Sequence, residues 1–145
     1  MFLTEPYAYK GHVTNVPTGL NGVYLGLPFF LKKEVNFIPI LISRDIIVVN
    51  TVFNDENYLL ICVYCSPSEE LEENLTIIER ILEKFRYYKT IINGDFNAKS
   101  PTWGQGNLDG RGRKLPELIY RMEMDIVNTM DSPPTFDSDR GKKMD

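Results

Sequence analysis

The fold is decided by residues 58–93, which read YLLICVYCSPSEELEENLTIIERILEKFRYYKTIIN. Apolar runs at residues 58–63 and 90–92 each lead into polar residues and then into proline or glycine, a pattern that predicts buried strands ending in loops. Between them, apolar residues recur every three or four positions and predict a helix with one apolar stripe: Leu71, Leu75, Ile78, Leu82 and Phe85. The alternation of strand, helix and strand predicts an α/β layered fold.

The ends of the predicted helices are marked by particular residues. Ser66 is the expected N-cap of the first helix, with Pro67 at its first position and Glu69 completing a capping box. A second helix is expected over residues 115–123, where Pro116 is tolerable only in the first turn. Further strands are expected at residues 1–3, 22–27 and 46–53.

Length and composition restrict the class of protein. The 145 residues are 43% apolar and 25% charged, which is typical of one globular domain, expected here over residues 1–145. No apolar run approaches the ~20 residues of a membrane span, and no secretory leader is recognised. The two cysteines, Cys62 and Cys65, predict buried thiols rather than a disulfide scaffold. We therefore expect an intracellular protein without a membrane segment.

Charge is distributed unevenly along the chain. The formal net charge of −4 argues mildly against a simple polyanion-binding protein. Acidic residues nevertheless dominate residues 69–83, and basic residues dominate residues 84–114. A solvated face with helix-end charge placement is one explanation, and a locally cationic binding surface is the other.

Residues 92–104, which read INGDFNAKSPTWG, carry the most informative polar groups. In extended backbone Asp95 and Asn97 would share one face, while Phe96 would point the other way. A carboxylate beside an amide at a strand end can hold a water and a phosphoryl oxygen together, and Gly94 would permit close backbone approach. The alternative is an Asx turn, in which Asp95 and Asn97 satisfy local backbone groups.

Two further polar residues follow apolar runs. Glu5 at such a position would suit Mg²⁺, which prefers oxygen ligands, although a surface acid in a loop is the simpler interpretation. Tyr64 could donate its hydroxyl to a phosphate oxygen, whereas a tyrosine in an apolar strand is most often part of the core.

Taken in order, five segments resemble the endonuclease domain of non-LTR retrotransposons. They read LTEPY at residues 3–7, SRD at 43–45, VYCSPS at 63–68, NGDFNAKSPTWG at 93–104 and GRGR at 110–113. That domain belongs to the endonuclease/exonuclease/phosphatase superfamily, and the likeness covers essentially the whole chain. The GDFN core is shared across the superfamily, whereas its extension to SPTWG points more narrowly to retroelement endonucleases.

The resemblance implies a fold, a reaction and a setting. The fold would be a four-layered α/β sandwich of the DNase I-like type. The reaction would be hydrolysis of a DNA phosphodiester that depends on Mg²⁺, with Mn²⁺ as a possible substitute. The nick would leave a 3′-hydroxyl that primes reverse transcription, with a reverse transcriptase domain in the same parent polypeptide and a nuclear site of action.

The resemblance also implies roles for individual residues. Glu5 would hold the metal, and Asp95 would position or activate the attacking water. Asn97 would bind the phosphate, Tyr64 would contact the transition state, and Asp145 would stand where the family has an Asp that orients a catalytic histidine. Contacts to the DNA backbone are expected from a basic stretch: Lys99, Arg111, Arg113 and Lys114.

The chain also departs from the family pattern. An N-terminal strand with an Asn near the metal and a C-terminal Ser-Asp-His segment are both missing, so we expect a domain that is incomplete at both ends. The only histidine, His12, is expected in a different loop from the catalytic one. General acid–base catalysis typically supplies about 10²–10⁴-fold in rate, so the chain is expected to be a weak catalyst or none. Two rivals remain open: a phosphatase or phosphodiesterase acting on small or lipid phosphates, and an inactive remnant or DNA-binding scaffold.

Overall fold

The computed structural model describes residues 8–9, 12–13, 20–25, 27–32, 35–103 and 107–127, the first four ranges as backbone alone. The chain divides between Ala98 and Lys99 into two compact units. The elements of the first unit are β1 (Ala8–Tyr9), β2 (His12–Val13), β3 (Leu20–Leu25), β4 (Leu27–Lys32), β5 (Phe37–Ile42), β6 (Ile46–Phe53), β7 (Glu56–Tyr64), α1 (Leu71–Lys84) and β8 (Lys89–Asp95). Those of the second are the 3₁₀ helix η1 (Pro101–Trp103) and α2 (Gly110–Arg121).

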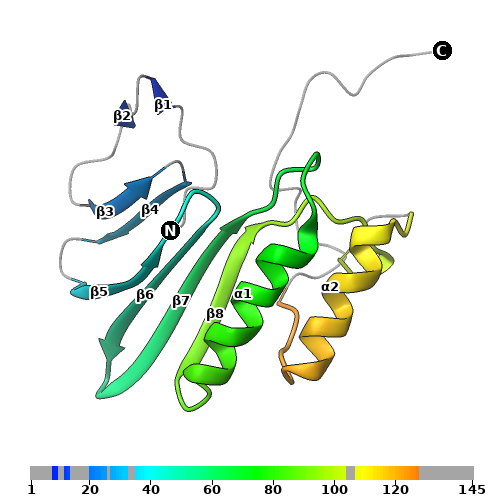
Figure 1. Cartoon of the computed structure of the whole chain (residues 1–145). Coiled ribbons are helices and arrows are strands. Elements are labelled where there is room, and N and C mark those ends of the chain that lie inside the picture. The colour runs from blue at the N-terminus through cyan, green and yellow to red at the C-terminus, as the bar shows by residue number, and fades with distance from the viewer. Residues whose placement is uncertain are drawn as a thin grey trace. The chain divides into compact units, whose positions relative to one another are not determined.

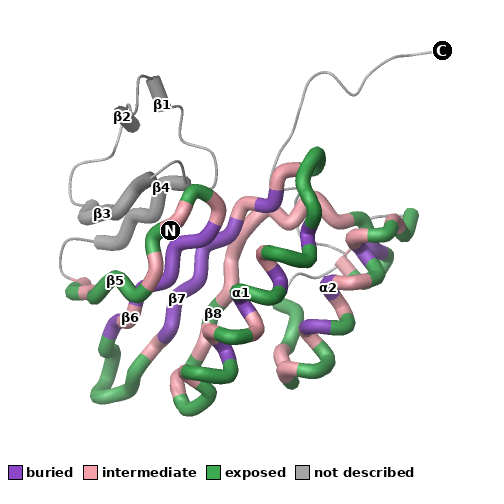
Figure 2. Tube along the Cα trace, viewed as in Figure 1, coloured by how far each residue is buried: buried purple, intermediate pink, exposed green. Residues whose placement is uncertain are grey.

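A four-stranded sheet in the order β5-β6-β7-β8 forms the centre of the first unit (Figure 1). β5, β6 and β7 pair antiparallel, whereas β7 and β8 pair parallel. A parallel pair needs a long crossover connection, and α1 supplies it. Consecutive residues are buried in the first half of β6, at residues 46–49, and in the second half of β7, at residues 59–63, so these stretches are covered on both faces (Figure 2). The predicted strands at residues 46–53 and 58–63 are therefore confirmed, and burial is confirmed except at the exposed end of the first, Val52 and Phe53.

The apolar stripe of α1 is confirmed by its burial. Leu71, Leu75, Ile78 and Leu82 are all buried, and Figure 1 shows α1 lying along β8 on one face of the sheet. Acidic Glu72 and Glu73 lie in its first turn and Lys84 in its last, where each sign of charge complements the helix dipole.

The predicted start of the first helix at Ser66 is wrong. Glu70 is the N-cap of α1, in extended conformation and without a side-chain cap bond. Residues 66–69 form a turn instead, in which Glu69 N–H donates to the Ser66 carbonyl (3.2 Å). The Ser66 hydroxyl pairs with the Ser68 hydroxyl (2.9 Å), because a serine in a turn can bond locally instead of capping a helix.

The antiparallel hairpin of β3 and β4 corrects another prediction. Its register pairs Leu25 with Leu27, so the single strand expected at residues 22–27 is divided between two strands. The strand expected at residues 1–3 lies outside the described residues, and the single domain expected over residues 1–145 stays a prediction.

The second unit contains α2, which begins five residues before the predicted start at residue 115 and places Pro116 in its interior. Asp109 is the N-cap, because its carboxylate accepts hydrogen bonds from Gly112 N–H (2.6 Å) and Lys99 N–H (3.1 Å). In this longer helix the Gly112 carbonyl would normally accept a hydrogen bond from the N–H of residue 116. Pro116 has no N–H, so this bond is absent. Neither α1 nor α2, the helices of the described residues, is long and apolar enough to cross a membrane.

Two glycines of α2 provide a matched test of this helix start. A Cβ at Gly112 would lie 1.8 Å from the Lys99 carbonyl oxygen, whereas a Cβ at Gly110 would meet nothing within 4 Å. We expect Gly112→Ala to lower the free energy of unfolding by about 1–3 kcal/mol through overpacking. Gly110→Ala should be neutral or stabilising by up to about 1 kcal/mol. Urea denaturation measures both, and equal effects would contradict the described contact between Gly112 and Lys99.

Candidate active site

Tyr64 and Asp95 end two neighbouring parallel strands. Their Cα atoms are register partners, so both residues lie at the carboxyl edge of the β7–β8 pair and on the same face of the sheet. Both are half-buried. The sequence prediction that these strands deliver polar groups to one edge is therefore confirmed for this pair.

Asp95 and Asn97 form an Asx turn. Asn97 N–H donates to Asp95 Oδ1 (2.9 Å), and Asn97 has a left-handed backbone with φ of 46°. The extended backbone that would give the two side chains a common face is therefore wrong, and the Asx-turn alternative is confirmed. The cause is local: β8 ends at Asp95, whose carboxylate captures the N–H two residues on, and asparagine tolerates positive φ.

The Asn97 side chain connects this turn to the end of β7. Its Nδ2 donates to the Cys65 carbonyl oxygen (3.1 Å), while Cys65 N–H donates to the Asp95 carbonyl oxygen (2.8 Å). Tyr64, Asp95 and Asn97 are therefore brought to one edge of the sheet by bonds that run through Cys65. Sequence reasoning missed Cys65, because its contribution is made by the main chain and leaves no signature in the side-chain pattern.

The Asx turn uses one oxygen of the Asp95 carboxylate. Within residues 35–103 and 107–127, no hydrogen bond reaches Asp95 Oδ2. The one buried side-chain N or O atom that lacks a partner in these ranges is Asn50 Oδ1, so Asp95 Oδ2 is not fully buried. The carboxylate can therefore hold its turn with one oxygen and accept a hydrogen bond or bind a cation with the other.

Gly94 permits close approach, but to the neighbouring strand. A Cβ at this position would lie 2.1 Å from the Val63 carbonyl oxygen. Only glycine lets the end of β8 approach β7 this closely, and the approach occurs next to the Tyr64–Asp95 pair.

The two cysteines are buried thiols. Cys62 and Cys65 are both buried, and neither forms a disulfide. Burial raises the pKa of Cys62 to about 11, so its thiol stays protonated near neutral pH. The predicted buried thiols are confirmed.

The basic residues belong to the second unit. Lys99 is exposed, as is Arg113, and Arg111 and Lys114 are half-buried. The last three lie within the first five residues of α2, whose first turn has no acidic residue. Cations are disfavoured at the positive end of a helix dipole, so helix-end charge placement, which explains the charges of α1, does not explain those of α2.

Two predicted site residues cannot be compared with the structure, and the histidine is placed only by its backbone. Glu5 and Asp145 lie outside the described residues. His12, expected in a loop, belongs to β2. Among the residues whose side chains are described, no three His, Cys, Asp or Glu residues gather as a metal-binding group.

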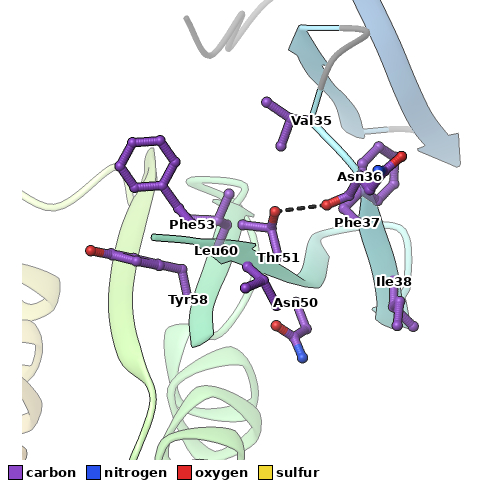
Figure 3. A pocket seen from close by; sticks show the side chains of 10 residues that line it. Val35, Asn36, Phe37, Ile38, Asn50, Thr51, Phe53, Tyr58 and Leu60 are labelled. Carbon is purple, nitrogen blue, oxygen red and sulfur yellow. Dashed lines mark hydrogen bonds between the residues drawn. The ribbon is translucent and has the colours of Figure 1, made fainter. Parts of the chain in front are cut away.

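A cavity of about 820 Å³ lies at the other end of the sheet (Figure 3). It is lined mainly by apolar and aromatic side chains, among them Phe37, Phe53 and Tyr58, and Thr51 in its wall donates to the Asn36 carbonyl oxygen (2.7 Å). Tyr58 and Leu60 come from the first half of β7, so the cavity is separate from the edge that carries Tyr64 and Asp95.

Comparisons with known proteins identify relatives of this chain. A family model described as endonuclease-reverse transcriptase matches residues 58–145. The chain is also similar to the solved endonuclease domain of TRAS1, a telomere-specific non-LTR retrotransposon, with a TM-score of 0.77 and 26% sequence identity. The similarity covers 97% of this chain and 65% of the TRAS1 chain. No curated protein matches the sequence.

The comparison with TRAS1 also bears on the fold class. The described residues form a mixed α/β fold with a four-stranded sheet and two α-helices, and the similarity makes this fold DNase I-like. The chain spans 65% of the length of the TRAS1 chain that it matches.

The Asx turn can be tested at Asn97. Asn97→Gly removes the bond to the Cys65 carbonyl and should lower the free energy of unfolding by about 1 kcal/mol. Asn97→Ala removes the same bond but keeps a Cβ in the left-handed region without the polar side chain that lets asparagine adopt it, which costs about 1–2 kcal/mol more than the glycine variant. Chemical denaturation measures both variants. An alanine variant as stable as the glycine variant would show that residue 97 is not left-handed in solution.

Proposed function

The chain belongs to the endonuclease-reverse transcriptase family, and we propose that it acts as the endonuclease of a non-LTR retroelement. The reaction is hydrolysis of a phosphodiester in DNA, with Mg²⁺ or, as a substitute, Mn²⁺. The observation that carries the proposal is the pairing of Tyr64 with Asp95 at the carboxyl ends of parallel strands, with one carboxylate oxygen that no hydrogen bond among the described residues uses.

The proposed roles follow from the chemistry of each group. Asp95 Oδ2 accepts a proton from the attacking water or holds that water in place. Tyr64 is one strand away on the same face, and its hydroxyl donates to a phosphoryl oxygen. Asn97 gives one amide hydrogen to the Cys65 carbonyl, and its second amide hydrogen donates to the phosphate. An amide whose orientation is already fixed loses little entropy when it binds phosphate.

The donor chemistry at this edge fits a hard divalent cation. Mg²⁺ is usually held by one or two carboxylates and keeps several waters. Glu5 is the proposed carboxylate ligand, and Asp95 Oδ2, which has no partner among the described residues, can accept a hydrogen bond from one of those waters. Bound Mg²⁺ would stabilise the charge that develops on the phosphoryl group.

Binding of DNA is proposed for the basic residues of the second unit. Arg111, Arg113 and Lys114 lie within the first five residues of α2, where the carboxylate of the Asp109 cap interacts with Arg111, and phosphates of DNA are the proposed further anionic partners of this group. Contacts from such side chains and from Lys99 to phosphates give affinity without sequence choice.

The wider setting is also part of the proposal. We propose the complete four-layered sandwich, of which the described sheet and α1 are two layers. Asp145 is proposed to orient a catalytic histidine. The nick would supply a 3′-hydroxyl for a reverse transcriptase in the same polypeptide, which requires action on nuclear DNA.

A plasmid-nicking assay with an isosteric substitution tests the proposal. The assay uses this chain and a chimera in which it replaces the aligned part of the TRAS1 endonuclease domain, because it spans 65% of that chain. We expect the chimera to nick supercoiled DNA with Mg²⁺ and to stop with EDTA. Asp95→Asn keeps the Oδ1 acceptor of the Asx turn but removes the charge, and should lower the rate by about 10²–10⁴-fold.

Asp55→Asn is the matched control. Asp55 is an exposed residue of the β6–β7 turn with φ of 61°, which asparagine also adopts, so the rate should not change. A folded chimera that does not nick, or an Asp95→Asn variant that nicks at full rate, would overturn the proposal. Cleavage of small phosphate esters without nicking would favour the phosphatase alternative, and DNA binding without cleavage would favour a scaffold.

A further inference from the structure

The Ser43-Arg44-Asp45 turn lies beside the proposed active site, although none of the proposed catalytic steps uses it. The Ser43 hydroxyl donates to the Ile46 carbonyl (2.9 Å) and accepts from Ile46 N–H (3.0 Å), which closes the turn before β6 begins. The Asp45 carbonyl oxygen then accepts a hydrogen bond from Tyr64 N–H (2.8 Å). This bond continues the β6–β7 ladder one step beyond its last register pair, Ile46 with Val63.

Arg44 connects the same turn to the loop that follows Tyr64. Its Nε donates to Asp45 Oδ1 (2.9 Å) and its Nη2 to Asp45 Oδ2 (2.6 Å). Nη2 also forms an ion pair with Glu69 Oε2. Two carboxylates, one from each segment, are therefore held by a single guanidinium group, whose planar fork fixes their relative orientation.

Residues 64–69 are consequently held at both ends. At the start, Tyr64 N–H is bonded to Asp45; at the end, the Glu69 carboxylate is bonded to Arg44. Between these two points lies Cys65, whose carbonyl receives the Asn97 amide. A segment anchored at one end only has more conformational freedom than one anchored at both, so the ion pair restricts the residues that orient Tyr64 and Asn97.

We infer that Arg44 is a positioning residue: through Asp45 and Glu69 it fixes residues 64–69 and thereby orients Tyr64 and the Cys65 carbonyl relative to Asp95. The inference rests on the proposed function for its effect on catalysis, whereas its effect on the segment stands on the contacts alone. Arg44 itself touches neither substrate nor metal in this account. Its contribution should appear in kcat and leave the KM for DNA unchanged.

A second exposed ion pair of the same sheet supplies a matched control. Lys89 pairs with Glu56 at the amino end of β8, at the opposite end from Tyr64. The exposed fractions of the side chains are close, 58% and 48% for this pair against 66% and 44% for Arg44 with Glu69. Exposed pairs of this kind contribute similarly little to stability, so a difference in nicking between the two pairs reports position and not stability.

The experiment is a double-substitution cycle on the nicking chimera. Glu69→Gln and Arg44→Gln should each lower kcat by about two- to fivefold, the range expected for an exposed ion pair. The double variant should be no slower than Arg44→Gln, because that substitution already removes the Arg44–Glu69 ion pair together with the Arg44–Asp45 bonds. Glu56→Gln and Lys89→Gln should leave kcat unchanged.

Amide hydrogen exchange provides a second readout that does not require activity. It is measured on this chain itself and its variants, and not on the chimera. The N–H groups of Tyr64 and Cys65 should exchange several-fold faster in Glu69→Gln and at the original rate in Glu56→Gln. Unchanged exchange in Glu69→Gln, or an equal loss of kcat in both glutamate variants, would overturn the inference. A chimera that never nicks would refute the proposed function, and the exchange rates would still decide the role of Arg44.

Discussion

The parallel pairing of β7 with β8 is the constraint on which the site depends. The parallel pairing places Tyr64 beside Asp95 on one face of the sheet. Antiparallel pairing would place the carboxyl ends of the two strands at opposite ends of the paired segment. The pairing in turn requires a crossover, which α1 supplies with a buried apolar stripe. Gly94 adds the close approach to the Val63 backbone beside this pair. The core of the first unit and the geometry of the proposed site thus have the same origin.

The Asx turn fixes the orientation of the Asp95 carboxylate and still leaves one of its oxygens for the proposed reaction. A carboxylate has two oxygens, and the turn uses Oδ1 while Oδ2 has no hydrogen bond among the described residues. The turn also rotates Asn97 so that its amide reaches Cys65 on the neighbouring strand end. A local structural role and a proposed catalytic role therefore coexist in one residue, although they are opposed alternatives when only the sequence is considered.

The spacing of apolar residues predicts the helices and strands that it buries. Features that depend on hydrogen bonds of the main chain are not predicted from the sequence. The stripe of α1 and the strand at residues 46–53 follow from apolar spacing alone. The start of α2 at Gly110 does not, since a run of Gly and Arg is a poor helix signal and the Asp109 cap decides it. Extended backbone and an Asx turn are equally compatible with Asp-Phe-Asn, so only the structure distinguishes them. The carbonyls of Asp45 and Cys65 have no sequence signature at all.

The central claim is that the carboxyl ends of β7 and β8 bind a divalent cation together with phosphate. Paramagnetic broadening of amide NMR signals by Mn²⁺ tests it most directly, because the broadening reports proximity to the ion residue by residue. The account predicts that the signals of Tyr64, Asp95 and Asn97 broaden first, that those of Glu56 and Lys89 at the opposite end stay sharp, and that excess Mg²⁺ reverses the effect. Broadening centred elsewhere in the chain, or broadening that Mg²⁺ does not reverse, would contradict it.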